Sequence, residues 1–442
     1  MGALGEAIPK TDYRKMNLNN SEKYWKRAEE LIPTGTQTYS KMPNRFAMGL
    51  TPKFIDYGEG AYLWDVDGNK FIDYVGALGP IILGYNYQPV NDAIKKQLEK
   101  GIIFSLGNIL EIELAELLAE TIPSAEMVKY GKNGNDITSA AVRVARAYTG
   151  RDKIIMCGYH GGQDWHIITT PRNLGVPKKL KEFSLTFEYN NIVSLESLFL
   201  ENKDQVAAVI MEPTGVMEPE DNFLQKVKEL AHEKGSLLIF DEVKTGFRCH
   251  IGGAQTLYGV IPDLSCFGKA MSNGMPMSAL VGKKEIMRKC EDIFFSMQAG
   301  GELLSIAASI ATIKELKKTD TISKVHDVGL LLKEGYKDLI QKHRLEAYMD
   351  IFGLPQYSVF DFKEIKAVSA LQVKTLFIQE SIKRGILTGG YSILSLAHTK
   401  EIIDMTLEVY DDVFKVIRKA VESNNFNHYL ECPVVEEVFR KP

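Results

Sequence analysis

Two residues of this 442-residue chain, Lys269 and Asp241, stand where their side chains could act on a bound carbonyl compound. Lys269 follows Gly268 among small and apolar residues. Burial makes a lysine amine a nucleophile, and such an amine forms a Schiff base with a carbonyl. Asp241 ends the apolar run 237–240, and a buried carboxylate needs a donor or a positive group, such as a protonated ring nitrogen. An exposed loop lysine and an aspartate that caps a turn remain the alternatives.

Two further segments offer complementary chemistry. Tyr159 lies among glycines directly after the apolar run 153–157, where an aromatic ring could lie flat on a planar ligand or pack into the core. A Gly/Asn turn at 131–135 precedes an amphipathic helix at 136–148, and backbone N–H groups at a helix start bind phosphate. An ordinary capped helix is the alternative for the turn, which matches neither the dinucleotide nor the Walker pattern.

Together these four features indicate one cofactor. A helix start at Gly134 for a phosphate, Tyr159 for a ring face, Asp241 for a ring nitrogen and Lys269 for an aldehyde are the groups that pyridoxal phosphate requires.

The elements around these residues predict an α/β fold with a mostly parallel sheet. Apolar runs alternate with helical patterns, which places helices on both faces of a sheet and ligands at the carboxyl ends of its strands. The predicted strands are 153–157, 206–211, 237–240 and 278–282, and helices are predicted at 136–148 and 221–234. Outside this region we predict a helix at 20–32, a hairpin at 61–73, helices at 311–318, 328–343, 366–384 and 399–421, and strands near 348–362. We expect an N-terminal segment (1–65) that joins a small C-terminal domain (311–442), and a large cofactor-binding domain (66–310).

Composition and charge exclude several classes of function. The formal net charge of −4 argues against a broad nucleic-acid surface. The five scattered cysteines suit neither a disulfide framework nor a zinc ribbon, and His160 and His166 have no third partner at metal-ligand spacing. The longest apolar stretch, 74–83, is too short to cross a bilayer, and the first ten residues contain no apolar signal core. We therefore expect a cytoplasmic protein that binds no metal, membrane or nucleic acid.

The sequence resembles the class III (fold type I) pyridoxal-phosphate aminotransferases, in the branch that contains glutamate-1-semialdehyde 2,1-aminomutase. The resemblance extends from about residue 20 to 421. Its most specific segments are 240–248 (FDEVKTGFR), 262–269 (PDLSCFGK), 145–154 (ARAYTGRDKI) and 159–161 (YHG).

This resemblance implies roles for individual residues and a homodimer with shared active sites. Lys269 would form the Schiff base and move the proton, and Asp241 would pair with the pyridine nitrogen. Val243 and Tyr159 would pack on the two ring faces, with Tyr159 also counted among the catalytic residues. The other cofactor-binding residues would be His160, Glu212, the phosphate-binding Gly134 and Asn135, and Gln298, which replaces a threonine that reaches the partner subunit's phosphate.

Three segments point to a different set of relatives than the aminomutase. Residues 132–136 (KNGND), 158–165 (GYHGGQDW) and 296–302 (SMQAGGE) resemble the aminotransferases of bacterial surface-polysaccharide pathways, which include the enzyme that forms 8-amino-3,8-dideoxy-octulosonate for lipopolysaccharide. We therefore predict that an aldehyde or keto sugar acid is aminated with glutamate as the donor. Hydroxyls for such a substrate are offered by Thr38, Tyr39, Ser40 and Tyr391. A glutamate-1-semialdehyde aminomutase of tetrapyrrole synthesis is the alternative, and a catalytically silent binding protein on this fold is a remote one.

Overall fold

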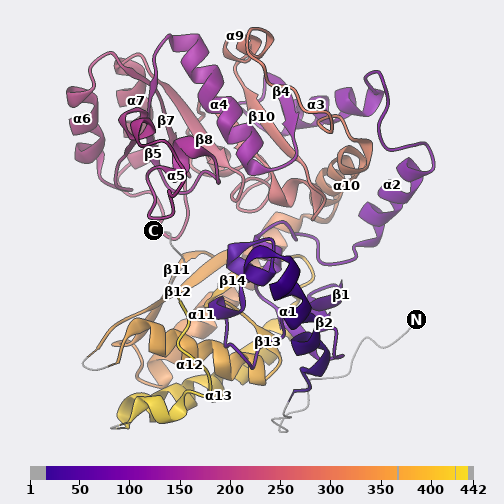
Figure 1. The fold of residues 1–442 in the computed structure, drawn as a ribbon, viewed down its shortest axis with the longest axis vertical. Helices are drawn as coiled ribbons and strands as arrows, with labels where there is room; N and C mark the ends of the chain where they lie inside the picture. Colours follow the sequence, from indigo (N-terminus) through magenta and orange to yellow (C-terminus); the bar gives the residue numbers. More distant parts are fainter. Residues whose placement is uncertain (1–15, 366–367, 424, 437–442) are drawn as a thin grey trace. The chain divides into compact units, whose positions relative to one another are not determined.

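The computed structural model describes residues 16–365, 368–423 and 425–436 (Figure 1). The described chain divides into two compact units, one formed by residues 79–83 and 87–324, and the other by the described parts of 1–78, 84–86 and 325–438. We call them the large-sheet unit and the small-sheet unit after the sheets that they contain.

The large-sheet unit is built on a seven-stranded sheet in the order β4-β10-β9-β8-β7-β5-β6. All neighbouring strands are parallel except at β10, which is antiparallel to both β4 and β9. The strands are β4 (Met127–Gly131), β5 (Lys153–Cys157), β6 (Ser184–Thr186), β7 (Val206–Met211), β8 (Leu237–Glu242), β9 (Leu264–Phe267) and β10 (Ser278–Gly282). The helices are α2 (Gln88–Leu98), α3 (Ile109–Thr121), α4 (Gly134–Thr149), α5 (Asp164–Ile167), α6 (Ile192–Glu201), α7 (Phe223–Glu233), α8 (Ala254–Leu257), α9 (Lys284–Met287) and α10 (Leu303–Thr319).

Alternation along the strands explains the layers. Ile154, Ile210 and Ile239 belong to one buried cluster with the apolar face of α4. Their strand neighbours Val209 and Leu238 belong to a second cluster, with residues of α6 and α7. Because successive side chains of a strand point to opposite faces, strands that are buried on both faces need helices on both sides. The predicted α/β fold with a mostly parallel sheet is therefore confirmed.

The small-sheet unit contains two smaller sheets, β1-β2-β3-β13 and β11-β12-β14. Its strands are β1 (Ile55–Glu59), β2 (Tyr62–Asp65), β3 (Lys70–Asp73), β11 (Met349–Leu354), β12 (Tyr357–Phe362), β13 (Ile386–Leu387) and β14 (Tyr391–Ile393). Its helices are α1 (Asn19–Leu31), α12 (Ala370–Lys383) and α13 (Lys400–Glu422), and α11 (Thr321–Lys342) begins in the large-sheet unit. The expected helix 366–384 begins on residues 366 and 367, which lie outside the described residues.

Asp263, at the start of β9, cross-links neighbouring elements of the large-sheet unit. Its buried carboxylate accepts hydrogen bonds from the Leu238 amide (2.8 Å), His232 Nε2 (2.7 Å) and Lys283 Nζ (2.7 Å). Burial alone would raise the pKa of this carboxyl, but the bonds from Lys283, Leu238 and His232 outweigh it and lower the pKa. The carboxylate therefore connects α7, β8 and the end of β10 as an anion.

We expect Asp263→Asn to destabilise the protein by about 2–4 kcal/mol at neutral pH, because the substitution removes one partner of a buried, hydrogen-bonded charge. Since the folded pKa of Asp263 is lowered, its contribution is complete above the unfolded pKa of about 4 and is lost as the pH falls through the folded value. Urea unfolding at several pH values measures both effects. Asp204→Asn is the control, because Asp204 is 73% exposed and lies 4.0 Å from Arg151. An equal response of the two variants would contradict this role.

Candidate active site

Strand register brings the predicted site segments to one edge of the large sheet. Cys157 is paired with Met211, Met211 with Phe240, and Asp241 with Cys266. Each of these strands runs in the same direction, so the segments that follow them emerge side by side. Tyr159, Glu212 and Lys269 come from these segments, and Asp241 is the penultimate residue of β8.

Asp241 lies at the centre of this edge and is paired with His160. His160 Nδ1 lies 2.9 Å from Asp241 Oδ2, and His160 Nε2 lies 3.1 Å from the Cys157 carbonyl oxygen. Both ring nitrogens therefore face oxygen atoms. The other Asp241 oxygen accepts from the Val243 amide at 3.1 Å. The His160 side chain has no exposed surface, so its contact with the site runs through Asp241.

Lys269 follows β9 in an unusual backbone conformation. Its φ of 45° lies in the left-handed region that a side chain other than glycine rarely adopts, and such strain gathers at functional sites. A Cβ at Gly79 would lie 3.4 Å from Lys269 Cδ, so Gly79 leaves room for the lysine stem.

Val243 packs between the start of α4 and the residue before Lys269. A Cβ at Gly134 would lie 3.3 Å from Val243 Cγ1, and a Cβ at Gly268 would lie 3.5 Å from the same atom. The structure thus brings together Asp241, Val243, Lys269 and Gly134, which the sequence analysis assigned to one ligand.

The start of α4 is fixed to the loop that carries Tyr159. The Asn135 side chain accepts from the Gly162 amide at 2.8 Å, and Thr138 Oγ1 donates to the His160 carbonyl at 2.9 Å. The Asn135 amide donates to the side chain of Asn133, the N-cap of α4, at 2.9 Å. A phosphate that used this amide would share it with Asn133.

Tyr159 and Glu212 flank this centre. The Tyr159 ring is half-buried and meets His166 edge-on, with ring centroids 5.2 Å apart. The Glu212 carboxylate lies 3.9 Å from Lys244 Nζ. The neighbouring thiol of Cys157 is a poor nucleophile, because burial and the charge of Glu212 raise its pKa to about 12.

The remaining predicted residues come from other segments of the chain. Gln298 is exposed in the turn that precedes α10. The proposed substrate residues all belong to the small-sheet unit, where Tyr39 is 46% exposed and Tyr391 is half-buried: Thr38, Tyr39, Ser40 and Tyr391.

Sequence reasoning missed two residues that hold the segment beside Lys269. Asn273 Oδ1 accepts the amides of Ile82 (3.0 Å) and Leu83 (2.9 Å). Arg248, which is buried, donates through Nη2 to the Gly79 carbonyl at 2.7 Å. The sequence offers no local signal for these contacts, because the partners lie about 170 and 190 residues away in the chain.

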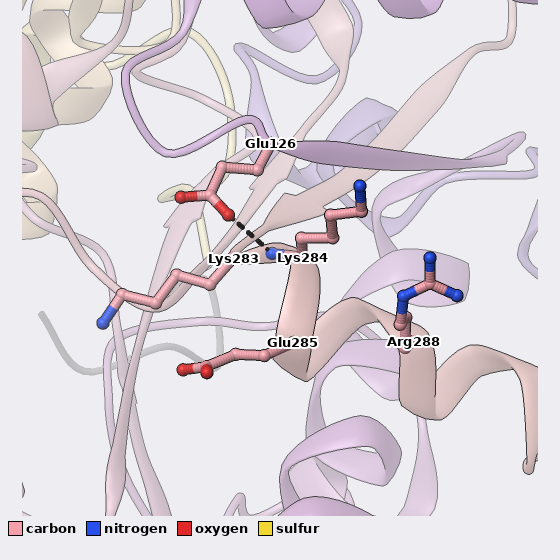
Figure 2. Close-up of a pocket in the computed structure, with 5 residues that line it drawn as sticks. All are labelled: Glu126, Lys283, Lys284, Glu285 and Arg288. Atoms are coloured by element: carbon pink, nitrogen blue, oxygen red, sulfur yellow. Dashed lines mark hydrogen bonds between the residues drawn. The ribbon is translucent and has the colours of Figure 1, made fainter.

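A surface hollow at the opposite edge of the sheet contains none of these residues (Figure 2). It is lined by Glu126, Lys283, Lys284, Glu285 and Arg288, and the Lys284 amide donates to Glu126 at 2.8 Å. Gly282, which precedes Lys283 in the chain, is paired with Leu264 at the start of β9, whereas Lys269 follows the end of β9. The hollow and Lys269 therefore lie at opposite ends of this strand.

The donor set at the first edge fits pyridoxal phosphate. An amine for an aldehyde, a buried carboxylate for a ring nitrogen, apolar and aromatic side chains for the ring, and a helix start for a phosphate come from adjacent strand ends. No described helix combines the length and apolar composition needed to cross a membrane.

Comparison with known proteins gives a consistent result. Residues 46–416 match the family model of the class-III aminotransferases. The chain is 36% identical over 417 residues to a 3-aminobutyryl-CoA aminotransferase of Cloacimonas acidaminovorans, covering 92% of this chain and 99% of the relative. It is 34% identical over 429 residues to a glutamate-1-semialdehyde 2,1-aminomutase of Lachnoclostridium phytofermentans, covering 90% and 100%.

A solved structure agrees in fold. The FumI protein of Sphingopyxis sp. MTA144, in its PLP internal aldimine form, superposes with a TM-score of 0.85 at 28% identity, covering 92% of this chain and 99% of that one. Since the family model spans most of the sequence, the chain belongs to the class-III aminotransferases, enzymes that depend on pyridoxal phosphate.

Proposed function

We propose that this aminotransferase transfers the amino group of glutamate to the aldehyde or keto group of a carboxylated sugar acid, with formation of 8-amino-3,8-dideoxy-octulosonate as the leading candidate reaction. One observation supports the transfer chemistry. Asp241, which is hydrogen-bonded to His160, and Lys269 lie at the ends of the adjacent strands β8 and β9. Support for the sugar acid comes from the three segments that resemble the polysaccharide-pathway aminotransferases, 132–136, 158–165 and 296–302.

Each site residue has a defined task in this proposal. Bound pyridoxal phosphate supplies an aldehyde for an amine and a ring that accepts electrons from the breaking Cα–H bond. Asp241, which is hydrogen-bonded to His160, would pair with the protonated ring nitrogen. Lys269 Nζ anchors the cofactor and then takes the proton from the donor's Cα.

The other residues position the ring and phosphate. Val243 and Tyr159 enclose the ring, and Glu212 orders the segment after β7. The start of α4 at Gly134 and Asn135 offers amides to the phosphate.

A single-turnover experiment tests the acceptor. The enzyme is converted to its amino-loaded form with glutamate and then mixed separately with 8-oxo-octulosonate, glutamate semialdehyde and 3-oxobutyryl-CoA, while the cofactor spectrum is followed. We expect the sugar acid to restore the starting spectrum fastest. If glutamate semialdehyde or the thioester alone reacts, the sugar-acid assignment is wrong while the transfer chemistry stands.

An aminomutase is the second candidate, and its support is the 34% identity to the Lachnoclostridium enzyme. An aminomutase returns the amino group to the same carbon skeleton and needs no glutamate. Turnover of glutamate semialdehyde with no added donor would favour this candidate.

We also propose a homodimer that forms over an apolar strip at residues 98–112. Large apolar side chains are exposed along this strip, and such concentrations mark interaction surfaces. The exposed fractions are Leu98 52%, Ile102 43%, Ile103 39%, Phe104 51%, Leu106 84%, Ile109 61% and Ile112 56%. The Ile102 carbonyl accepts from the Leu303 amide at 2.9 Å, which connects the strip to the turn that carries Gln298. A homodimer with shared active sites would therefore have the turn that carries Gln298 tied to its interface.

The strip makes a direct prediction about the oligomeric state. Leu106→Glu should convert the dimer to monomer at micromolar concentration, because it places a charge in the apolar contact. Light scattering after size-exclusion chromatography measures the mass. Leu200→Glu is the matched control, since Leu200 is 77% exposed on α6, away from the strip. A Leu106→Glu variant that remains a dimer would rule out this surface.

A further inference from the structure

We propose that Lys132 and Glu302 are a positioning pair that ties the turn carrying Gln298 to the start of α4 and thereby sets the affinity for the cofactor's phosphate end. This inference rests on the proposed function, because it assumes that the phosphate lies at the start of α4. The pair joins two of the three segments that resemble the polysaccharide-pathway aminotransferases.

The contact itself is short and partly buried. Lys132 Nζ lies 3.0 Å from Glu302 Oε2, and each side chain is 17% exposed. Met277 Sδ lies 4.0 Å from the same ammonium group. Because partial burial reduces screening by water and salt, this pair is stronger than an exposed one.

Each charge is fixed to the start of a helix. The Lys132 amide donates to Asp136 Oδ2 at 2.9 Å, and Asp136 belongs to the capping box of α4. Glu302 is the N-cap of α10 and accepts the Leu304 amide and the Ser305 hydroxyl, each at 2.6 Å. Burial would raise the pKa of Glu302, but the bonds from Ser305, Lys132 and Leu304 lower it, so the carboxylate stays charged at neutral pH. The ion pair therefore connects two helix starts.

The turn between Gln298 and Glu302 is short and closed by hydrogen bonds. The Gly300 amide donates to the Met297 carbonyl at 3.0 Å, and the Glu302 amide donates to the Ala299 carbonyl at 3.2 Å. A Cβ at Gly301 would lie 3.2 Å from Glu111 Cδ, so this glycine lets the turn approach α3. Displacement of Glu302 must therefore move Gln298 as well.

The opposite charges of Lys132 and Glu302 also compensate each other. Lys132 without Glu302, or Glu302 without Lys132, would leave a partly buried charge without its partner in this contact. The structure thus accounts for the joint presence of a lysine in 132–136 and an acid in 296–302.

The test is a double-mutant cycle read out by cofactor binding. Lys132→Gln, Glu302→Gln and the double variant are stripped of pyridoxal phosphate and titrated with it, and the dissociation constant is measured from the cofactor's absorbance. We expect each single variant to bind about 5- to 20-fold more weakly, and the double variant to bind no more weakly than the worse single variant. Lys132→Arg, which keeps the charge, should restore affinity to within about twofold of the parent. Lys132→Gln leaves the cap of α10 intact, so the test stands even if Glu302→Gln fails to fold.

Two controls separate positioning from stability. Ser305→Ala removes a hydroxyl partner of Glu302 but keeps the ion pair, and it should lower the melting temperature without changing cofactor affinity. Lys317→Gln breaks a more exposed pair between α10 and Glu120 of α3, whose side chains are 35% and 73% exposed, and should change neither.

Two results would overturn the inference: parental cofactor affinity in both single variants, or losses that multiply in the double variant. Borohydride reduction of the parent distinguishes this failure from failure of the proposed function. If the parent is labelled on Lys269 and the variants keep the parental cofactor affinity, only the role of the pair is rejected. If the parent binds the cofactor but Lys269 carries no label, the proposed site is rejected and the role of the pair with it.

Discussion

Lys269→Ala is expected to lower transamination by at least about 10³-fold, because it removes both the amine that anchors the cofactor and the base that moves the proton. The rate of the glutamate half-reaction measures the loss directly. Borohydride should attach the cofactor to the Lys269 peptide of the parent and to no peptide of the variant, as read by mass spectrometry.

Two matched variants sharpen this expectation. Lys269→Arg keeps the positive charge, but a guanidinium stays protonated, so this variant should be as inactive as the alanine variant. Lys284→Ala removes an exposed lysine at the opposite edge of the sheet and should leave the rate unchanged. Near-parental turnover by Lys269→Ala would refute the proposed site.

The second large effect is expected for Asp241→Asn, which should lower kcat by about 100-fold or more while the cofactor still binds. An amide cannot hold the ring proton by charge, and the substitution also deprives His160 of its anionic partner at 2.9 Å. Stopped-flow measurement of Cα–H cleavage, with α-deuterated glutamate as a check, isolates the affected step.

The adjacent carboxylate provides the control for Asp241. Glu242 is fully buried on the opposite face of β8 and accepts the amides of Ala254 and Gln255, each at 2.8 Å. Glu242→Gln should therefore reduce stability and leave the proton-transfer step within about threefold of the parent. Equal effects of the two variants on kcat would mean that Asp241 acts through folding alone.

Sequence pattern predicted the parallel core because the relevant strands are buried on both faces. The runs 153–157, 206–211 and 278–282 coincide with β5, β7 and β10. Strand β8 extends two residues further than predicted, through Asp241 and Glu242, because pairing with β9 continues to Phe267. Strand β9 was not predicted, since it has only four residues, and its buried Ser265 interrupts the apolar run and pairs with Ser124.

Outside the core, the helices were predicted well where one face is polar. The helices α1 and α13 lie within a residue or so of the predicted ranges, whereas α10 begins at Leu303 rather than at 311. The first half of α10 is buried on most sides and shows no helical period in its sequence. Its start depends on the Glu302 side chain, which caps it.

Site residues could be predicted from the sequence where they lie close to the end of a strand. Asp241 is the penultimate residue of β8 and Lys269 lies two residues after the adjacent strand β9, so sheet topology alone places them together. Arg248 and Asn273 could not be predicted, because their partners Gly79 and Ile82 are about 170 and 190 residues away in the chain. Such contacts exist only once the fold has brought the segments together.

The packing of Val243 between two glycines has a consequence for enzyme engineering. An alanine at Gly134 would press on Val243 at 3.3 Å, whereas one at Gly268 would only touch it at 3.5 Å. A larger side chain at one of these three positions can therefore be accommodated by a smaller one at another, so the effects of substitutions at the three positions are not additive. A mutant library that varies them one at a time would reject combinations, such as Gly134→Ala with Val243→Ala, that a joint library would retain.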